Sequence, residues 1–240
     1  MDNEKASYNS RLIYILMFFV AFFWGLAWPV GRILATDLLN YPFSIMFLRY
    51  IFAIPVLFGW LWFKEGIVIP LKRDYIYLLT LAFTSVFLYQ IGYMYGMQRT
   101  AASDASLIIG FNPVSVSILS VFILSHNLTR NGLLGIFLSF IGVLLIFLVS
   151  PNIDIDFYDR LVGNAYIMLG AFAYAIYVVF MRRYVLLTDY RPLSSLATIS
   201  WTSLVGCILF VPFVFLEAPW DRIWNNQEWL LIAYLGVLST

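Results

Sequence analysis

The chain has 240 residues, of which 62% are hydrophobic and only 11% are charged, and its formal net charge is +1. A soluble domain carries about 25% charged residues, so this composition excludes an ordinary soluble protein. The basic residues form no patch, which excludes nucleic acid as a partner, and the single cysteine excludes a disulfide framework. Several nearly uncharged runs are long enough to cross a hydrocarbon layer of ~30 Å, so we predict an all-α polytopic membrane protein embedded in the lipid bilayer.

The first half of the chain predicts a polar tail, residues 1–10, followed by five membrane helices. A signal peptide is the competing interpretation of the first apolar run, but that run is too long and lacks a convincing cleavage site. The short turn at 98–100 requires the third and fourth helices to form an antiparallel hairpin. The five expected helices cover residues 11–36, 42–63, 75–97, 101–124 and 132–149.

The second half predicts a polar connection at 151–160, helices at 163–181 and 192–216, and the start of an eighth helix at Trp229. Only about twelve residues of that eighth helix are present, whereas ~20 are needed to span the bilayer. We therefore expect the sequence to end within helix 8, as a fragment or a truncated frame of a longer protein. The alternative is a complete seven-helix protein with a C-terminal helix at the membrane interface.

The two halves carry one pattern twice. Trp24 is followed eight positions later by Arg32, and the same spacing returns 150 residues on in Tyr174 and Arg182. The last residues, 235–240, align with the middle of the third helix at an offset of 154. A pattern that returns at a fixed offset predicts two copies of one unit, since internal repeats have this signature.

The distribution of basic residues predicts the orientation of the two copies, which cover residues 11–150 and 151–240. A cytoplasmic N-terminus places nine of the fourteen lysines and arginines on the inner side, as the positive-inside rule requires. Arg32 then lies near the outer end of its helix and Arg182 near the inner end of its own. Because a unit of five helices is odd, the second copy must be inverted, an architecture that many secondary transporters share. The plasma membrane is the expected location.

Several short motifs, weak one by one, occur in an order and spacing that resemble the EamA family of the drug/metabolite transporter superfamily, from about residue 12 to 240. The chain departs from the family at His126, where the family commonly has glutamate. The motifs are Trp24-Gly25 with Arg32, Phe47-Leu48-Arg49-Tyr50, Tyr93-Met94-Tyr95-Gly96-Met97 followed by Ala101-Ala102-Ser103-Asp104-Ala105-Ser106-Leu107, Asn112-Pro113, and Leu128-Thr129 followed by Gly135 and Gly142.

This resemblance implies a fold of ten helices in two repeats of five, and the export of small metabolites, often amino acids, by alternating access. It implies a small-molecule partner, and self-association is left open. A lone histidine, a single cysteine and no cluster of membrane acids leave no catalytic triad or metal site, so no enzyme, cofactor or metal is expected. The alternative functions are a non-transporting assembly subunit or, less favoured, an intramembrane enzyme.

One face of the third helix carries the most informative residues, which recur at i, i+3 and i+4. They are Val86, Tyr89, Gln90, Tyr93 and Met97. Since lipid offers Gln90 no partner, this face is expected to point into the bundle, either as a cavity wall for a partly apolar solute or as aromatic packing. Gly92 and Gly96 form a small-xxx-small pair, which predicts the close approach of another helix.

Two further groups complete the predicted substrate-binding set. Aromatic residues of helices 1 and 6 occupy equivalent or neighbouring positions of the two copies, and Asn112 stands beside Pro113, which removes a helical hydrogen bond. Asn112 either satisfies the carbonyl freed in this way or faces the solute. The predicted substrate-binding residues are Trp24, Trp28, Tyr89, Gln90, Tyr93, Asn112, Tyr174 and Tyr177.

Three charged residues are expected to have structural or gating roles. Arg49 is interpreted as reaching the outer interface or pairing with Asp37 or Asp104, in preference to binding a substrate carboxylate, because shallow arginines snorkel. Arg32 is shallower and is interpreted in the same way. Asp104 lies in the first turn of helix 4, where the helix dipole favours a carboxylate, and this role is preferred over proton coupling.

Overall fold

The computed structural model describes residues 10–125, 128–149, 154–187 and 193–240. Within these ranges the protein is all-α, and seven spans are long and apolar enough to cross a membrane. The elements are α1 (Ser10–Asp37), α2 (Pro42–Glu65), α3 (Asp74–Ala82), the π-helical segment η1 (Phe83–Leu88), α4 (Tyr89–Met97), α5 (Ala102–Ile109), α6 (Asn112–Leu124), α7 (Arg130–Val149), α8 (Phe157–Leu187), α9 (Ser195–Glu217), the 3-10 turn η2 (Pro219–Asp221) and α10 (Asn226–Leu238).

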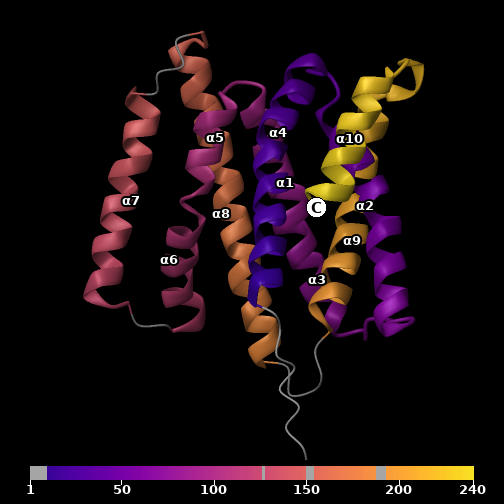
Figure 1. Cartoon of the computed structure of the whole chain (residues 1–240), viewed down its shortest axis with the longest axis horizontal. Helices are drawn as coiled ribbons and strands as arrows, with labels where there is room; N and C mark the ends of the chain where they lie inside the picture. Colours follow the sequence, from indigo (N-terminus) through magenta and orange to yellow (C-terminus); the bar gives the residue numbers. More distant parts are fainter. Residues whose placement is uncertain (1–9, 126–127, 150–153, 188–192) are drawn as a thin grey trace, which may run out of the picture.

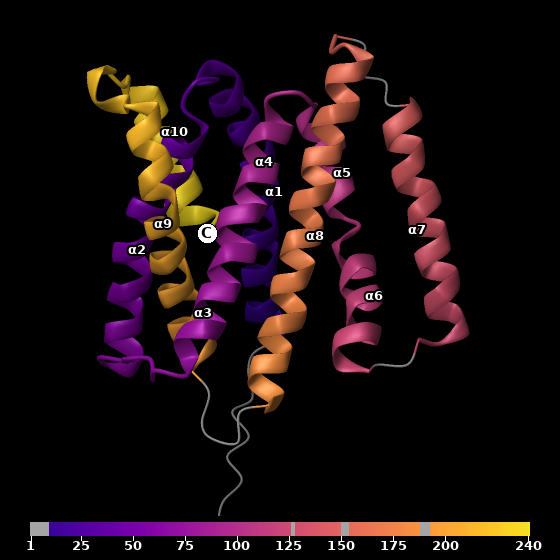
Figure 2. The same cartoon turned by 180° about the vertical axis from the view of Figure 1, so that it is seen from behind.

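The spans stand side by side and alternate in direction along the chain (Figure 1). We call the end at which α1 ends and α8 begins the upper end, and the opposite end the lower end. The helix α7 lies at one edge of the bundle, α8, α4 and α1 lie in the middle, and α2, α9 and α10 form the other edge (Figures 1 and 2). The prediction of a polytopic helical membrane protein is therefore confirmed.

The fourth predicted span is present at Ala102–Leu124, but it consists of two helices that are separated next to Pro113, where the sequence predicts a lost hydrogen bond. α5 ends at Ile109 and α6 begins at Asn112, and between them the N–H groups of Gly110 and Phe111 donate to carbonyls only three residues back, at 3.1 and 2.9 Å. Pro113 has no N–H to donate to Ile109, and its ring crowds the preceding turn, so the α-helical ladder breaks here.

The third predicted helix is continuous but contains a wide turn in its middle. The N–H of Tyr89 donates to the carbonyl of Thr84, five residues back, where an α-helix would use the carbonyl four residues back. Such π-helical turns are rare and rotate the residues that follow relative to those before. The turn therefore sets how Ser85 and Val86, within η1, face relative to Tyr89.

Glycines hold α4 and α8 in close contact, as the small-xxx-small pair predicts. A Cβ placed on Gly92 would lie 2.6 Å from the carbonyl oxygen of Tyr166 and 2.8 Å from the Cα of Gly170, on α8. A Cβ on Gly96 would lie 2.6 Å from the side chain of Ile167. At Gly92 and Gly170 the two backbones meet because neither residue has a side chain, and at Gly96 the Ile167 side chain occupies the space that the glycine leaves, a packing mode typical of membrane helices.

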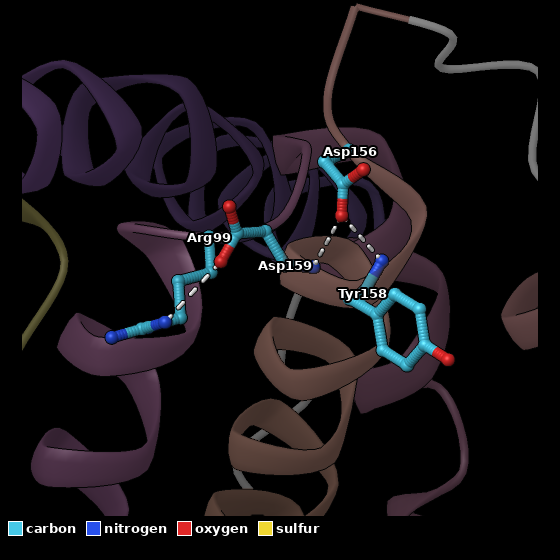
Figure 3. A network of polar contacts seen from close by, with 4 residues as sticks. All are labelled: Arg99, Asp156, Tyr158 and Asp159. Atoms are coloured by element: carbon cyan, nitrogen blue, oxygen red, sulfur yellow. Dashed lines mark hydrogen bonds and ion pairs between the residues drawn. The ribbon is translucent and has the colours of Figure 1, made fainter.

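The start of α8 is joined to the end of α4 by a small polar network (Figure 3). Asp156 caps α8, since its Oδ1 accepts from the backbone N–H of Tyr158 at 2.8 Å and of Asp159 at 3.4 Å. Arg99 lies 3.3 Å from Asp159, and both side chains are about half exposed, at 46% and 59%. Exposed pairs of this kind contribute less than about 1 kcal/mol, so the network orients the helices without binding them strongly.

The two arginines of the predicted repeat, Arg32 and Arg182, lie at opposite ends of the bundle. Arg32 donates to the carbonyl of Met97 at the end of α4, close to the start of α8. Arg182 lies 23 residues after Asp159 on the same helix, which is about 35 Å at 1.5 Å per residue. Opposite ends are what an inverted second copy requires, and the inverted repeat itself stays a prediction.

Candidate functional site

A cavity of about 130 Å³ lies inside the bundle, between helices of the two halves of the chain. Residues of α1, α2, η1 and α4 form one side of it, and residues of α8, α9 and the end of the chain form the other. The lining residues are Trp24, Arg49, Tyr50, Ser85, Val86, Tyr89, Gln90, Tyr174, Tyr177, Ile199, Thr202, Ser203, Ser239 and Thr240.

Five of the eight predicted substrate-binding residues line this cavity: Trp24, Tyr89, Gln90, Tyr174 and Tyr177. The rings of Tyr89 and Tyr174 lie 5.4 Å apart between centroids, and those of Tyr174 and Tyr177 also lie 5.4 Å apart. Three tyrosines therefore form one continuous aromatic wall that joins α4 to α8. Aromatic pairs prefer such separations, because the edge of one ring meets the face of another.

Trp28 and Tyr93 contact each other and do not line the cavity. Their ring centroids lie 5.4 Å apart, and the Tyr93 hydroxyl donates to the Ala27 carbonyl at 2.6 Å. The Tyr93 ring occupies the space that Gly31 leaves by having no Cβ. Both side chains are buried, so in this structure they pack α1 against α4.

Asn112 lies at the first residue of α6, next to the break in the fourth span, and does not line the cavity. Its Oδ1 is buried and has no hydrogen-bond partner among the residues that the structure describes. The helices α5 and α6, between which the break lies, are on the side of α8 that faces α7 (Figure 1). Asn112 therefore stays a predicted site residue that the structure separates from the others.

The interpretation of Arg49 as an interfacial or carboxylate-paired arginine is wrong. Its side chain is only 8% exposed, and it donates to Gln90 Oε1 at 3.3 Å, to the Ser239 carbonyl at 3.1 Å and to Thr240 Oγ1 at 3.1 Å. The helix α10 covers it, because Gly236 lets the backbones of α10 and α2 meet at the Arg49 carbonyl. Covered in this way, the guanidinium turns inward to the cavity and to Gln90.

A chain of hydrogen bonds fixes the polar side of the cavity. The Gln90 amide donates from Nε2 to the Tyr50 hydroxyl at 3.0 Å and accepts from Arg49 through Oε1. Gln90 is 2% exposed and Tyr50 is 4% exposed, so neither side chain has another orientation that keeps both bonds. Buried polar groups bonded in this way are held rigidly.

Arg32 and Asp104 do not line the cavity. Arg32 lies near the end of α1 and donates to the Met97 carbonyl, where the C-terminus of α4 favours a cation. Asp104 lies in the first turn of α5 and is buried, as the sequence predicts for its position. Their gating or structural roles stay predictions.

Hydroxyl residues of α9 and the chain end line the cavity but were absent from the predicted set. A signal was available in the sequence, because a membrane helix that carries Thr202 and Ser203 has polar groups that lipid cannot satisfy. The repeat offsets give a second signal. At an offset of 150, Trp24 matches Tyr174 and Arg49 matches Ile199, and at 154, Ser85 matches Ser239 and Val86 matches Thr240. All eight of these residues line the cavity.

Several expectations fall on residues outside the described ranges: the polar tail apart from Ser10, His126, residues 151–153 of the polar connection, and Pro192 at the expected start of the seventh helix. In the ranges that are described, no group of three His, Cys, Asp or Glu side chains is arranged to hold a metal ion. Cys207 lies buried in α9, and its thiol faces the Phe47 carbonyl at 3.9 Å.

Comparison with known proteins finds similarity to one family of transporters. The model of the EamA-like transporter family matches residues 11–148 and 161–240. The chain is similar to the uncharacterized transporter YetK of Bacillus subtilis (strain 168), at 31% identity over 196 residues, which is 80% of this chain and 58% of that protein. It is similar to an uncharacterized transporter of Archaeoglobus fulgidus, at 27% identity over 202 residues, 83% of this chain and 66% of that protein.

A third relative is the uncharacterized transporter YyaM of Bacillus subtilis (strain 168), at 32% identity over 180 residues, 74% of this chain and 57% of that protein. The chain thus spans between 57% and 66% of the length of these relatives. The family match covers most of the chain and both of its halves. The protein is a multi-pass membrane protein and belongs to the EamA-like transporter family.

Proposed function

We propose that this protein is a secondary transporter that exports small organic metabolites, such as amino acids, by alternating access. The observation that carries the proposal is the composition of the cavity, which is lined by four pairs of residues that match at the predicted repeat offsets of 150 and 154. In transporters built from inverted repeats, the solute site lies where the repeats meet. The direction of transport, the cytoplasmic N-terminus and the plasma membrane rest on the family resemblance and the positive-inside rule.

Contacts at both ends of the bundle support an alternating mechanism. At the upper end, the Glu217 carboxylate of α9 accepts from the backbone N–H groups of Phe43 and Ser44, at 2.8 and 2.7 Å, and from the Ser44 hydroxyl at 2.6 Å. The positive end of the α2 dipole favours a carboxylate there. This cluster holds α2 and α9 together above the cavity.

A second set of contacts holds the lower end. Trp201 of α9 donates from its indole N–H to the Val68 carbonyl at 2.9 Å, and the Tyr184 hydroxyl of α8 donates to Asp74 Oδ1 at 3.0 Å. The cavity lies between these two sets. A solute is released to one side when one set separates while the other stays closed.

Transport by the purified protein tests the proposal. Proteoliposomes that carry the protein are loaded with radiolabelled amino acids and related metabolites, one at a time, and efflux is compared with empty liposomes. We expect efflux of at least one solute above the liposome background. No movement of any solute across a broad panel would contradict the proposal. A thermal-shift screen of the same panel identifies the solutes to test first.

A further inference from the structure

The cavity contains a buried positive charge whose described contacts are all neutral. Arg49 is 8% exposed, and its hydrogen bonds go to a side-chain amide, a backbone carbonyl and two hydroxyls. Arg49 takes part in neither of the two ion pairs that join Arg99 to Asp159 and Arg222 to Glu228. Burying a cation without a charged partner costs free energy. A negative group on a solute would offset the part of this cost that the neutral partners leave.

We propose that this cavity binds a small organic carboxylate, with the carboxylate on Arg49 and the apolar part of the solute against the tyrosine wall of Tyr89, Tyr174 and Tyr177. The proposal rests on the proposed function, because it names the substrate class of the same site. A guanidinium suits this role, since its planar fork matches the two oxygens of a carboxylate.

The surroundings of Arg49 hold the guanidinium in place for such a ligand. Gln90 accepts a hydrogen bond from Arg49 and donates one to the Tyr50 hydroxyl. These two bonds hold the guanidinium in a fixed position. A side chain that is held before binding loses little entropy when the ligand arrives. The support therefore favours binding at a defined position over loose attraction.

A second polar group of the cavity also lacks a partner. The Thr202 side chain is 97% buried, lines the cavity, and its hydroxyl has no hydrogen-bond partner among the described residues. A hydroxyl both donates and accepts, so it suits a second polar group of the solute. An orphaned buried hydroxyl is rare in a native structure, and a ligand is one of the explanations for it.

Size and charge limit the solute further. An apolar cavity of about 150 Å³ accommodates benzene in another protein, so the ~130 Å³ of this cavity suits a compact solute of similar bulk. Among the described residues that line the cavity, Arg49 is the one cation, and the residue at an offset of 150 from it is Ile199. We therefore expect monocarboxylates to bind better than dicarboxylates, whose second charge would find no cation.

Matched pairs of acids and neutral amides test the proposal directly. The probes are acetate and acetamide, isobutyrate and isobutyramide, and benzoate and benzamide, each pair nearly equal in shape. Binding to the purified protein is measured from intrinsic tryptophan fluorescence, because Trp24 lines the cavity, and from the thermal shift. We expect at least one acid to bind about tenfold or more tightly than its amide, the ratio that one charge-assisted hydrogen bond provides.

Variants separate the role of Arg49 from general effects of charge. In Arg49→Gln the preference for the acid over its amide is expected to disappear, and Arg49→Lys is expected to retain part of the preference. Arg99→Gln removes an exposed arginine of the upper end and is expected to leave the preference for the acid unchanged. The folded state of each variant is checked by its elution profile and melting temperature. If Arg49→Gln does not fold, the test is made with Thr202→Val, which is expected to weaken binding of hydroxy acids such as lactate more than of isobutyrate.

The outcomes distinguish this proposal from the proposed function. Equal binding of acid and amide in every pair, or an acid preference that survives in Arg49→Gln, would overturn the carboxylate site even if the protein transports other solutes. If the acids bind with the expected dependence on Arg49 but no solute crosses the membrane, the carboxylate site stands and the transport proposal fails.

Discussion

The contact between α4 and α8 and the cavity beside it use neighbouring residues of one helix for opposite purposes. Gly92 and Gly96 place no side chain toward α8, so the α8 backbone packs against Gly92 and the Ile167 side chain packs against Gly96. Tyr89 and Gln90, within one turn of Gly92, turn toward a space that the other helices leave open. The difference shows how a membrane bundle separates rigidity from binding: small residues fix the helices, and polar and aromatic residues line the gap.

The largest effect is expected from filling the glycine contact. In Gly92→Leu the new side chain would overlap with the backbone of α8, which cannot move as a side chain can, so we expect a loss of more than about 3 kcal/mol and little folded protein. Gly135→Leu on α7 is the matched control, because a Cβ there meets nothing within 4 Å. Melting in detergent measures both, and equal stability of the two variants would contradict the packing role of Gly92.

The cavity is expected to respond in the opposite way, with function lost and folding kept. Gln90→Leu removes the amide between Arg49 and Tyr50, so the guanidinium loses its support. We expect transport to be abolished while the amount of protein in the membrane is unchanged, with at most about 1–3 kcal/mol of stability lost for the unmade hydrogen bonds. Unchanged transport in this variant would show that the third span does not line the solute path.

A smaller effect is expected at the upper end, where the halves are joined above the cavity. Glu217→Ala removes an acceptor of three hydrogen bonds at the start of α2, which costs about 1–2 kcal/mol by analogy with loss of a helix N-cap. We expect labelling of an engineered cysteine in the cavity from this side to become several-fold faster. A rate equal to that of the parent protein would show that this cluster does not close the upper end.

The smallest effect distinguishes a packing tyrosine from a binding one. Tyr93→Phe removes one hydrogen bond to the Ala27 carbonyl, worth about 1 kcal/mol, and leaves the ring over Gly31 in place. We expect a slightly lower melting temperature and unchanged transport. Transport reduced as strongly as in Gln90→Leu would place Tyr93 back among the binding residues.

The sequence predicted the spans well because their apolar runs and polar turns are local features. It also predicted which face of the third span points inward, since Gln90 and its neighbours recur at helical spacing. It failed where several elements act together. The partners of Arg49 lie 41 and 190 residues away, on Gln90 and Ser239, and no local pattern contains that pairing. The π-helical turn arises from the hydrogen bonds of one particular turn, which hydrophobic periodicity does not describe. The break at Gly110 lies next to Pro113, so the sequence indicated the lost hydrogen bond there but not the separation into two helices.

Accessibility of the cavity from the two sides of the membrane tests the central claim most directly. Ser85→Cys and Ser239→Cys, each in a Cys207→Ala background, are labelled with a membrane-impermeant thiol reagent from the inside and from the outside of sealed vesicles. Ser139→Cys on the outer helix α7 is the control and is expected to stay unlabelled. We expect both cavity cysteines to be labelled from either side and to be protected by a transported solute. Labelling confined to one side, with no protection by any transported solute, would contradict a path between the two halves.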